Sequence, residues 1–325
     1  MSDRNGGKPV ITGVGTGPDT SASPSDSTAG EAAVYGYFPG CELRTRSTAL
    51  DSSARQACRA LRVELREMKD WTCCGGLAPQ VRDDYAGLLA PTRVLVEARA
   101  QGYEELVTLC AYCFNTLKRA HFMLEHNADA RRHVTAFLEL GELRPARVLH
   151  LLEVLRDRVG IERIEQAVNS PLHGLKVAPY YGCLLLRPAQ EIGLDDPEDP
   201  SVLEELLGAL GCDVTAFQAK SDCCGSYHIV TDPESVARCA DTVLDAVAEA
   251  EAAVVVTSCP VCQFNLDWRG SLAGNGRTPV VYFTQLLALA LGEPIEQLGF
   301  DESALAALAL LPAPRSSDER SQEER

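Results

Sequence analysis

The sequence predicts an α/β protein with two pseudo-symmetric halves, each built around a parallel sheet. Two observations lead to this fold class. Short apolar runs typical of buried strands alternate with longer segments of helical period, and one pattern of cysteines occurs twice along the 325-residue chain. At about 150 residues per domain, this length also suits two domains.

Four short apolar segments have the composition and length of buried strands. They are 34–38, 106–109, 177–181 and 254–257. Helical spacing follows at 83–100, 201–210 and 233–250, and we expect Ser201 and Asp232 to be N-caps. Strands that alternate with helices form βαβ units, so each half should be Rossmann-like, with ligands bound beyond the carboxyl ends of its strands.

The cysteines carry most of the functional information. The chain has thirteen of them, and no apolar signal sequence precedes them, so we expect a cytoplasmic protein in which structural disulfides are rare. Ten fall into two copies of the pattern Cys, Cys-Cys-Gly, Cys-x-x-Cys, offset by 142 to 150 residues. The first copy is Cys41, Cys73, Cys74, Cys110 and Cys113, and the second is Cys183, Cys223, Cys224, Cys259 and Cys262. This is an internal duplication.

The spacing within each copy brings its sulfurs to one edge of a sheet, because the predicted strands end close to motif cysteines. The first two cysteines are separated by 31 and 39 residues in the two copies. The Cys-Cys pair and the Cys-x-x-Cys are separated by 35 and 34 residues. Gly40, Gly75, Gly182 and Gly225 adjoin these cysteines and would let the backbone approach a bound group.

Five thiolates in each half restrict the cofactor. A structural zinc ion takes four ligands, and so does a standard iron–sulfur cube. Five is also an odd number for disulfides. A polynuclear iron–sulfur cluster with an additional thiolate accounts best for the count, and zinc or a thiol-based redox protein are the alternatives.

At these residues the sequence resembles the CCG-motif family that includes the B subunit of heterodisulfide reductase. The resemblance covers about 34–292, with both motifs complete, and includes 279–292 after the second motif. It implies two Rossmann-like CCG repeats, with one non-cubane [4Fe-4S] cluster on each set of five cysteines at the carboxyl edges of the strands. It also implies two-electron reduction of a disulfide, or the reverse thiol oxidation, between two facing clusters.

The resemblance implies partners as well. In the family these are a ferredoxin-like iron–sulfur protein, the C subunit, and often a flavoprotein, the A subunit. A different function stays open, because related two-motif proteins serve as the electron-transfer or anchor subunit of an unusual succinate dehydrogenase or fumarate reductase and relay electrons to quinone.

Charge and hydropathy exclude other classes. The net charge of −16 argues against nucleic-acid binding, which needs a basic surface. No apolar run reaches the roughly 20 residues of a membrane span. The nearest run, 280–291, is interrupted by Thr284 and Gln285. A peripheral position at the inner face of the membrane stays compatible with the sequence.

Two residues beside the second motif are candidates for catalysis. His228 follows Cys224 by four residues and could donate a proton to a new thiolate, or be an ordinary loop histidine. Arg187 follows Cys183 by four and could bind an acidic thiol substrate, or form a structural ion pair. We expect Asn115 and Asn265 to bond near the cluster sulfurs.

The remaining cysteines and histidines are expected to be structural. Buried packing suits Cys58, Cys212 and Cys239. The polar surroundings of four histidines predict surface positions: His121, His126, His133 and His150.

The chain divides into five predicted parts. They are a disordered tail at 1–32, a first repeat at 33–127, a helical linker at 128–170, a second repeat at 171–292, and a C-terminal helix and disordered tail at 293–325.

Overall fold

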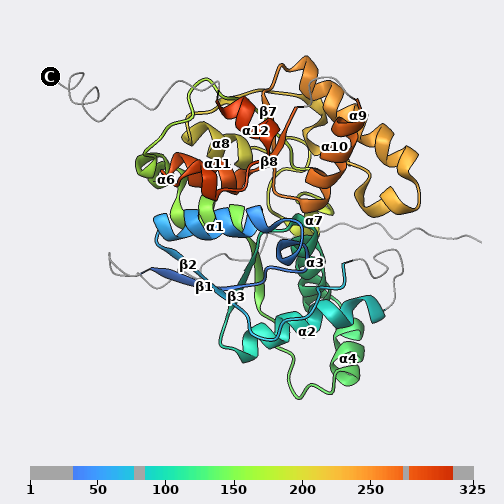
Figure 1. Cartoon of the computed structure of the whole chain (residues 1–325). Helices are drawn as coiled ribbons and strands as arrows, with labels where there is room; N and C mark the ends of the chain where they lie inside the picture. Colours follow the sequence, from blue (N-terminus) through green and yellow to red (C-terminus); the bar gives the residue numbers. More distant parts are fainter. Residues whose placement is uncertain (1–31, 77–84, 274–277, 310–325) are drawn as a thin grey trace, which may run out of the picture. The chain divides into compact units, whose positions relative to one another are not determined.

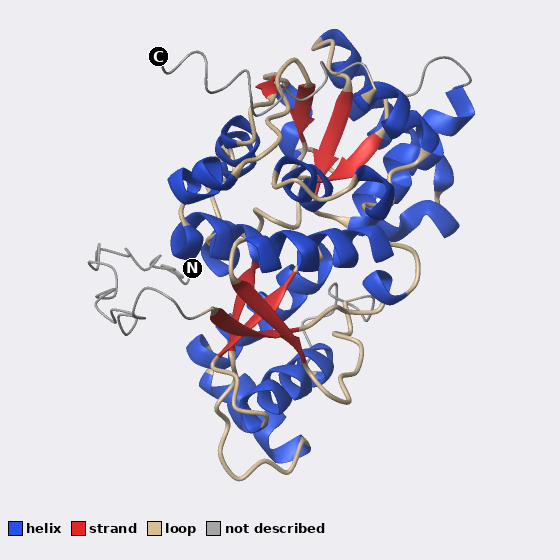
Figure 2. Ribbon diagram, turned by 60° about the vertical axis from the view of Figure 1, so that its left-hand side comes forward, coloured by secondary structure: helices blue, strands red, loops and turns tan. Residues whose placement is uncertain are grey.

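The fold is α/β, as predicted, with two separate parallel sheets (Figures 1 and 2). The structure is a computed structural model, and it describes residues 32–76, 85–273 and 278–309. Of the two predicted tails, 1–31 and 310–325 therefore lie outside the described residues.

The first half contributes four strands and the helices between them. Its elements are β1 (Ala33–Tyr37), α1 (Thr48–Ala60), β2 (Val63–Glu67), α2 (Ala86–Ala100), β3 (Glu105–Thr108), α3 (Ala111–His126), α4 (Ala128–Phe137) and β4 (Arg147–His150). The helical segment that leads to the second half consists of α5 (Leu151–Val154), the π-helical turn η2 (Leu155–Val159) and α6 (Ile161–Ala167).

The second half repeats this arrangement. Its elements are β5 (Lys176–Pro179), α7 (Ala189–Ile192), α8 (Val202–Ala209), β6 (Asp213–Val214), α9 (Pro233–Glu249), β7 (Val254–Thr257), α10 (Pro260–Ala273), β8 (Val280–Tyr282), α11 (Phe283–Ala290) and α12 (Glu302–Leu308).

The two sheets have the same topology. The strand orders are β2-β1-β3-β4 and β6-β5-β7-β8, and every pairing is parallel. The strand order of each sheet changes direction at one point, between β1 and β3 in the first sheet and between β5 and β7 in the second. Open α/β sheets bind ligands at such a switch point. The duplication seen in the cysteines therefore extends to the fold.

The four predicted strands lie within two residues of β1, β3, β5 and β7. The other four strands were not predicted. One of them, β4, lies inside the segment 128–170 that we expected to be a helical linker, and it pairs with β3. That segment therefore completes the first sheet as well as joining the halves.

The apolar segment 280–291 is explained by packing between the halves. It forms β8 and α11, and α11 lies alongside α1 of the first half (Figure 1). The hydroxyls of Ser53 and Thr284 hydrogen-bond across this contact at 2.7 Å, and Leu50 and Leu286 belong to one continuous buried core. Across the described part of the chain, no helix is both long and apolar enough to traverse a bilayer.

The two predicted N-caps differ in how they act. Asp232 caps α9 as expected, because its carboxylate accepts the Ser235 N–H at 3.1 Å. Ser201 stands at the N-cap of α8 but makes no capping bond with its side chain. Asp195 takes this role, since its Oδ2 accepts the N–H groups of Ser201 and Val202, both at 2.8 Å.

Candidate metal centre

The three parts of each cysteine motif follow the carboxyl ends of three strands. In the first half, Cys41 follows β1, Cys73 and Cys74 follow β2, and Cys110 follows β3. Cys110 is also the N-cap of α3. The positive end of this helix dipole favours a thiolate in its first turn, where Cys113 lies. The second half repeats the arrangement after β5, β6 and β7.

The five sulfurs of the first motif converge. The Sγ atoms of Cys74 and Cys113 are 3.5 Å apart. The other three thiols lie close enough to shift the pKa values of their neighbours, with Cys73 acting on Cys41, Cys74 on Cys73, and Cys110 on Cys113. The sulfurs therefore form one continuous chain at the edge of the first sheet.

The second motif has a similar but looser arrangement. The Sγ atoms of Cys183 and Cys223 are 3.8 Å apart, and those of Cys224 and Cys262 are 3.4 Å apart. Cys259 lies close enough to Cys262 to raise the pKa of that thiol, after the larger effect of Cys224. The fold thus brings together within each half the five cysteines that the sequence grouped.

Burial divides each set into inner and outer sulfurs. The inner cysteines are buried, and the outer ones are exposed except for the half-buried Cys183. The inner set is Cys74, Cys110, Cys113, Cys224, Cys259 and Cys262, and the outer set is Cys41, Cys73, Cys183 and Cys223. A group bound by these sulfurs would be anchored from the protein side and accessible from the other.

One thiol in each half is stabilised as a thiolate, the form that binds metals. Hydrogen bonding with Cys113 lowers the pKa of Cys74 to about 4, with help from Cys73 and the backbone N–H of Gly76. Hydrogen bonding with Cys183 lowers the pKa of Cys223 to about 6, although burial opposes it. Their hydrogen-bond partners Cys113 and Cys183 have raised pKa values for the converse reason.

The motif glycines have two different roles. All four have positive φ. A Cβ on Gly40 would lie 2.7 Å from the Cys113 sulfur, and one on Gly182 would lie 3.0 Å from that of Cys262. Gly75 and Gly225 instead leave room for α2 and α9, where a Cβ would meet Ala90 and Val236. Of these four, Gly40 and Gly182 are the ones where a side chain would collide with a motif sulfur, whereas the backbone N–H of Gly75 donates to the Cys73 sulfur at 3.5 Å.

Polar atoms without partners gather at the motifs. Six buried side-chain atoms within the described residues lack a hydrogen-bond partner. Four of these belong to residues in or within three positions of a motif cysteine, namely Thr108, Tyr112, Ser258 and Asn265. Buried hydroxyls normally have partners, so a bound group with acceptor atoms would explain three of the four.

These donors and the two sulfur sets fit an iron–sulfur cluster, whose irons are ligated by thiolates and whose sulfur atoms accept hydrogen bonds. Within 32–76, 85–273 and 278–309, no three His, Cys, Asp or Glu side chains are arranged as a ready site for one metal ion. The fit therefore rests on the thiol sulfurs and on the donors around them.

Two tyrosines lie between the motifs. Burial raises the pKa of Tyr112, and so do the charges of Tyr227, Cys74 and Cys259. Burial likewise raises the pKa of Tyr282, which Cys259 and Cys110 raise further. Tyr112 lies inside the first motif, and its ring contacts Tyr227, which follows Cys224 by three residues, so the two motifs adjoin across the contact between the halves.

His228 lies near the second motif and is exposed. It belongs to the short 3₁₀ helix η4 (Ser226–Val230), and its ring stacks on Tyr227 with centroids 4.9 Å apart. In its protonated form it would add to the effects that lower the pKa of Cys223, after the larger effect of the Cys183 hydrogen bond. The structure therefore brings His228 to the outer side of the second sulfur set.

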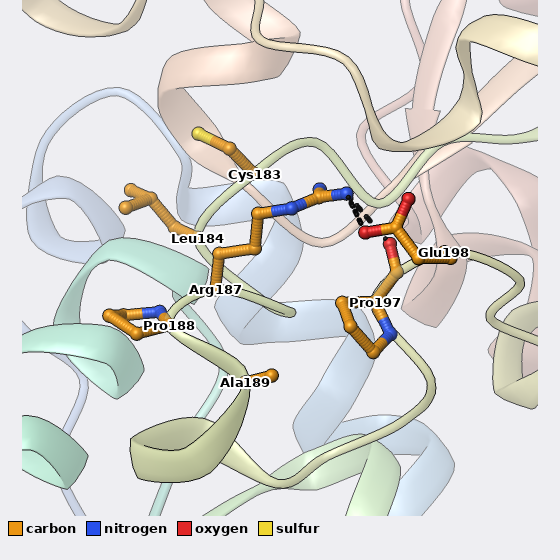
Figure 3. A pocket seen from close by; sticks show the side chains of 7 residues that line it. All are labelled: Cys183, Leu184, Arg187, Pro188, Ala189, Pro197 and Glu198. Atoms are coloured by element: carbon orange, nitrogen blue, oxygen red, sulfur yellow. Dashed lines mark hydrogen bonds and ion pairs between the residues drawn. The ribbon is translucent and has the colours of Figure 1, made fainter. Parts of the chain in front are cut away.

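Arg187 lines a pocket of about 570 Å³ together with Cys183 (Figure 3). Its Nη2 donates to the Pro197 carbonyl at 2.9 Å and to a Glu198 carboxylate oxygen at 3.0 Å. Figure 3 shows the Cys183 sulfur directed away from this guanidinium. The Arg187 guanidinium is thus engaged by acceptors of the protein itself.

The two asparagines act differently. Asn265 Nδ2 donates to the carbonyls of Cys224 and Ser226, at 3.0 and 2.6 Å, and so holds the loop after the second Cys-Cys pair. Asn115 Nδ2 donates across the halves to the carbonyls of Leu184 and Arg187. Both asparagines therefore bond beside a motif cysteine, as expected. Asn265 Nδ2 also lies 3.5 Å from the Cys224 sulfur, and Asn115 bonds next to Cys183 of the other half.

The structural cysteines are largely as predicted, but two of the four histidines are not at the surface, since His121 is half-buried and His150 lies in the core. Cys58 and Cys212 are buried and Cys239 is half-buried. His150, expected at the surface, is fully buried at the N-cap of α5. Its Nδ1 accepts the Leu152 N–H, so its Nε2 donates to the carbonyl of Leu109, next to Cys110.

Sequence comparison identifies the class that this fold and site define. The chain matches the CCG cysteine-rich domain family twice, over residues 35–118 and 177–267. It belongs to this family, in the duplicated form, and its relatives include the B subunit of heterodisulfide reductase.

Two curated relatives span most of the chain. It is 33% identical over 85% of its length to the 8-methylmenaquinol:fumarate reductase membrane anchor subunit of Wolinella succinogenes, 98% of which is covered. It is 27% identical over 84% of its length to the B subunit of the ferredoxin:CoB-CoM heterodisulfide reductase of Methanosarcina mazei, 94% of which is covered.

One solved structure supports the fold. A hypothetical protein from Helicobacter pylori superposes with a TM-score of 0.64 at 15% sequence identity. The match covers 83% of this chain and 51% of the other.

Proposed function

We propose that the protein is the iron–sulfur subunit of a heterodisulfide-reductase-like complex, with one non-cubane [4Fe-4S] cluster on each set of five cysteines. The observation that carries this proposal is the presence of two convergent sets of sulfurs in motifs that adjoin between the halves. Each cluster, when bound, would supply one electron at a time to a sulfur substrate between them.

The reaction balances with two such centres. A disulfide RS–SR′ takes two electrons and two protons, its S–S bond breaks, and two thiols RSH and R′SH form. The electrons come from a partner of the ferredoxin-like iron–sulfur class, and the reverse reaction returns them to it. The potentials of substrate and partner decide the direction.

A cavity of about 520 Å³ offers access to this region. Its lining includes Glu42 and Arg46, which follow Cys41, and Ser226, Tyr227 and Val261, which accompany the second motif. We propose that substrate enters through this cavity, which borders both halves. Three of the four outer cysteines are exposed, so substrate could reach their sulfurs from solvent.

Two further residues complete the proposed site. His228, beside Cys223, is the candidate donor of one of the two protons. Arg187, in the pocket beside Cys183, is the candidate partner for an anionic substrate group, for which it would exchange its exposed partner Glu198.

A second function is favoured by the 33% identity to the membrane anchor of a fumarate reductase. In that case the two clusters would relay electrons between a quinone and a flavoprotein, without thiol chemistry. For both functions we propose a cytoplasmic complex with a ferredoxin-like iron–sulfur partner or a flavoprotein partner, at the inner face of the membrane in the second.

Anaerobically purified protein separates these functions. We expect about eight iron atoms and as much acid-labile sulfide per chain, the content of two [4Fe-4S] clusters. An EPR signal that changes on adding a thiol supports the sulfur reaction. A signal that is indifferent to thiols but is oxidised by a quinone supports the relay, and stoichiometric zinc without iron after reconstitution refutes both.

Cysteine variants test the ligand sets in the same preparation. Cys110→Ala and Cys259→Ala should each lose about half of the iron, because each removes a ligand of one cluster only. Cys239→Ala is the matched control, since this half-buried cysteine lies outside both motifs, and it should retain all the iron.

A further inference from the structure

The hydroxyl of Tyr112 is buried without a partner at the centre of the site. Tyr112 lies inside the first Cys-x-x-Cys, and only 6% of the residue is exposed. Its phenolic oxygen makes no hydrogen bond within the described part of the protein. A buried phenol normally bonds to something, because leaving the group unpaired costs stability.

Packing fixes the position of this ring. One face lies against the backbone of Gly76, where an added Cβ would be 2.6 Å from the Tyr112 Cε1. Tyr227 of the second half makes an edge-on contact with the ring, with centroids 6.1 Å apart. The hydroxyl therefore cannot turn far to find a partner elsewhere in the protein.

Tyr112 is also placed beside both motifs. It lies between Cys110 and Cys113 of the first, and its ring contacts Tyr227, three residues after Cys224 of the second. Tyr282, the other phenol between the motifs, differs in one respect: its hydroxyl donates to Ser47 at 2.9 Å. Of these two phenols, only Tyr112 has a hydroxyl that is free to donate a hydrogen bond to a bound molecule.

The duplicated motif does not repeat this phenol. The position equivalent to Tyr112 in the second Cys-x-x-Cys is Val261, an apolar residue that lines the cavity between the halves. A donor needed to hold a cluster in place would be expected in both copies. A donor present in one copy suits a ligand that lies between them.

We propose that the Tyr112 hydroxyl donates a hydrogen bond to the sulfur of a thiolate bound between the two cysteine motifs. The phenol keeps its proton in this role, and it orients and stabilises one of the two product sulfurs. This inference rests on the proposed sulfur reaction. Alternative acceptors are a cluster sulfur or an ordered water, and the experiment separates them.

The test measures thiol affinity in the anaerobic, iron-loaded protein. Tyr112→Phe retains the ring that packs on Gly76, and Tyr282→Phe is the control because it removes a phenol that is already paired. EPR titration with a small thiol should give a dissociation constant about 10-fold or more weaker for Tyr112→Phe, as expected for a lost bond to a charged group. The control should stay within about twofold of the wild type.

A second readout identifies the bond directly. In D₂O, the thiol-bound wild type should show an exchangeable deuteron coupled to the EPR signal, and Tyr112→Phe should lose that deuteron. Equal thiol affinity in wild type and Tyr112→Phe overturns the inference. This is the result expected if the Tyr112 hydroxyl donates to an ordered water and not to the thiolate. A shifted cluster potential in thiol-free Tyr112→Phe with unchanged thiol affinity also overturns it and assigns the bond to the cluster. A wild type that ignores thiols refutes the sulfur reaction itself, which is a distinct result.

Discussion

Gly40 and Gly182 offer a sharp test of the metal centre, because a single methyl group there would collide with a ligand sulfur. In Gly40→Ala the new Cβ would lie 2.7 Å from the Cys113 sulfur. Ordinary contacts between such atoms are about 3.5–4.0 Å, so the sulfur must shift by about 1 Å. Functional sites tolerate displacements of about 0.5 Å, and we therefore expect the first cluster to be lost.

Backbone strain must be separated from this collision. Gly40 has φ +72°, and a side chain at such an angle costs about 1–2 kcal/mol. Gly102→Ala is the control in the same half, because Gly102 has φ +90° and nothing within 4 Å of an added Cβ. For Gly182→Ala, the control is Gly193→Ala, at φ +59° and also in open space.

The assay is iron per chain after anaerobic reconstitution. We expect Gly40→Ala to fall from about eight iron atoms to about four, the content of one [4Fe-4S] cluster. Gly182→Ala should fall less, because its Cβ would be 3.0 Å from the Cys262 sulfur. Both controls should keep about eight iron atoms and lose only stability. Equal iron in Gly40→Ala and Gly102→Ala would refute the reasoning that Cys113 must occupy its present position.

Three further predictions concern stability and the second site. Burial lowers the pKa of His150 from 6.5 to about 4, so the unfolded state binds the proton first as pH falls. The folded protein should lose roughly 3 kcal/mol between about pH 6.5 and 4, and anaerobic thermal unfolding of His150→Gln should lack this component. A double-mutant cycle of Ser53→Ala and Thr284→Val, with the free energy of unfolding measured in urea, should give a coupling free energy of about 1 kcal/mol. A coupling free energy of zero would contradict the hydrogen bond between the halves. Asn265→Leu should release iron to a chelator several-fold faster, because it frees the loop after the second Cys-Cys pair, whereas Asn127→Ala, which uncaps only α4, should not.

The sequence predicts the strands that carry long apolar runs and misses those that do not. Strands β1, β3, β5 and β7 lie at the centres of the two sheets, and β7 is buried throughout. Three of their neighbours at the sheet edges, β2, β4 and β6, lack this signal, whereas the edge strand β8 is apolar and buried but continues directly into the apolar helix α11. The edge strand β2 has the sequence VELRE, with alternate residues exposed, and β6 has only two residues. Edge strands are held by one neighbour, which hydrophobic periodicity alone does not reveal.

The candidate site divides in the same way. The sequence alone assigns the ten cysteines to two sets of five, because the same spacing of cysteines occurs in both copies of the duplicated motif. His150 shows no such signal, since its burial depends on a strand, β4, that became recognisable only through its pairing with β3. Asn115 bonds to the other half across 69 residues of sequence, so its role also depends on the tertiary fold.

The differences between the two halves indicate how a symmetric frame could act on an asymmetric substrate. The shared parts, which are the sheet order, the five sulfurs and the close glycines, are those that a pair of similar clusters would need. The unshared parts border the space between the sulfur sets. Tyr112 occurs in the first Cys-x-x-Cys where Val261 occurs in the second, and Cys41 is exposed where Cys183 is half-buried. A mixed disulfide has two unlike ends, and each would meet a different surface. Thiols resembling each end should therefore respond unequally to Tyr112→Phe, and equal responses would argue that the two sides are interchangeable.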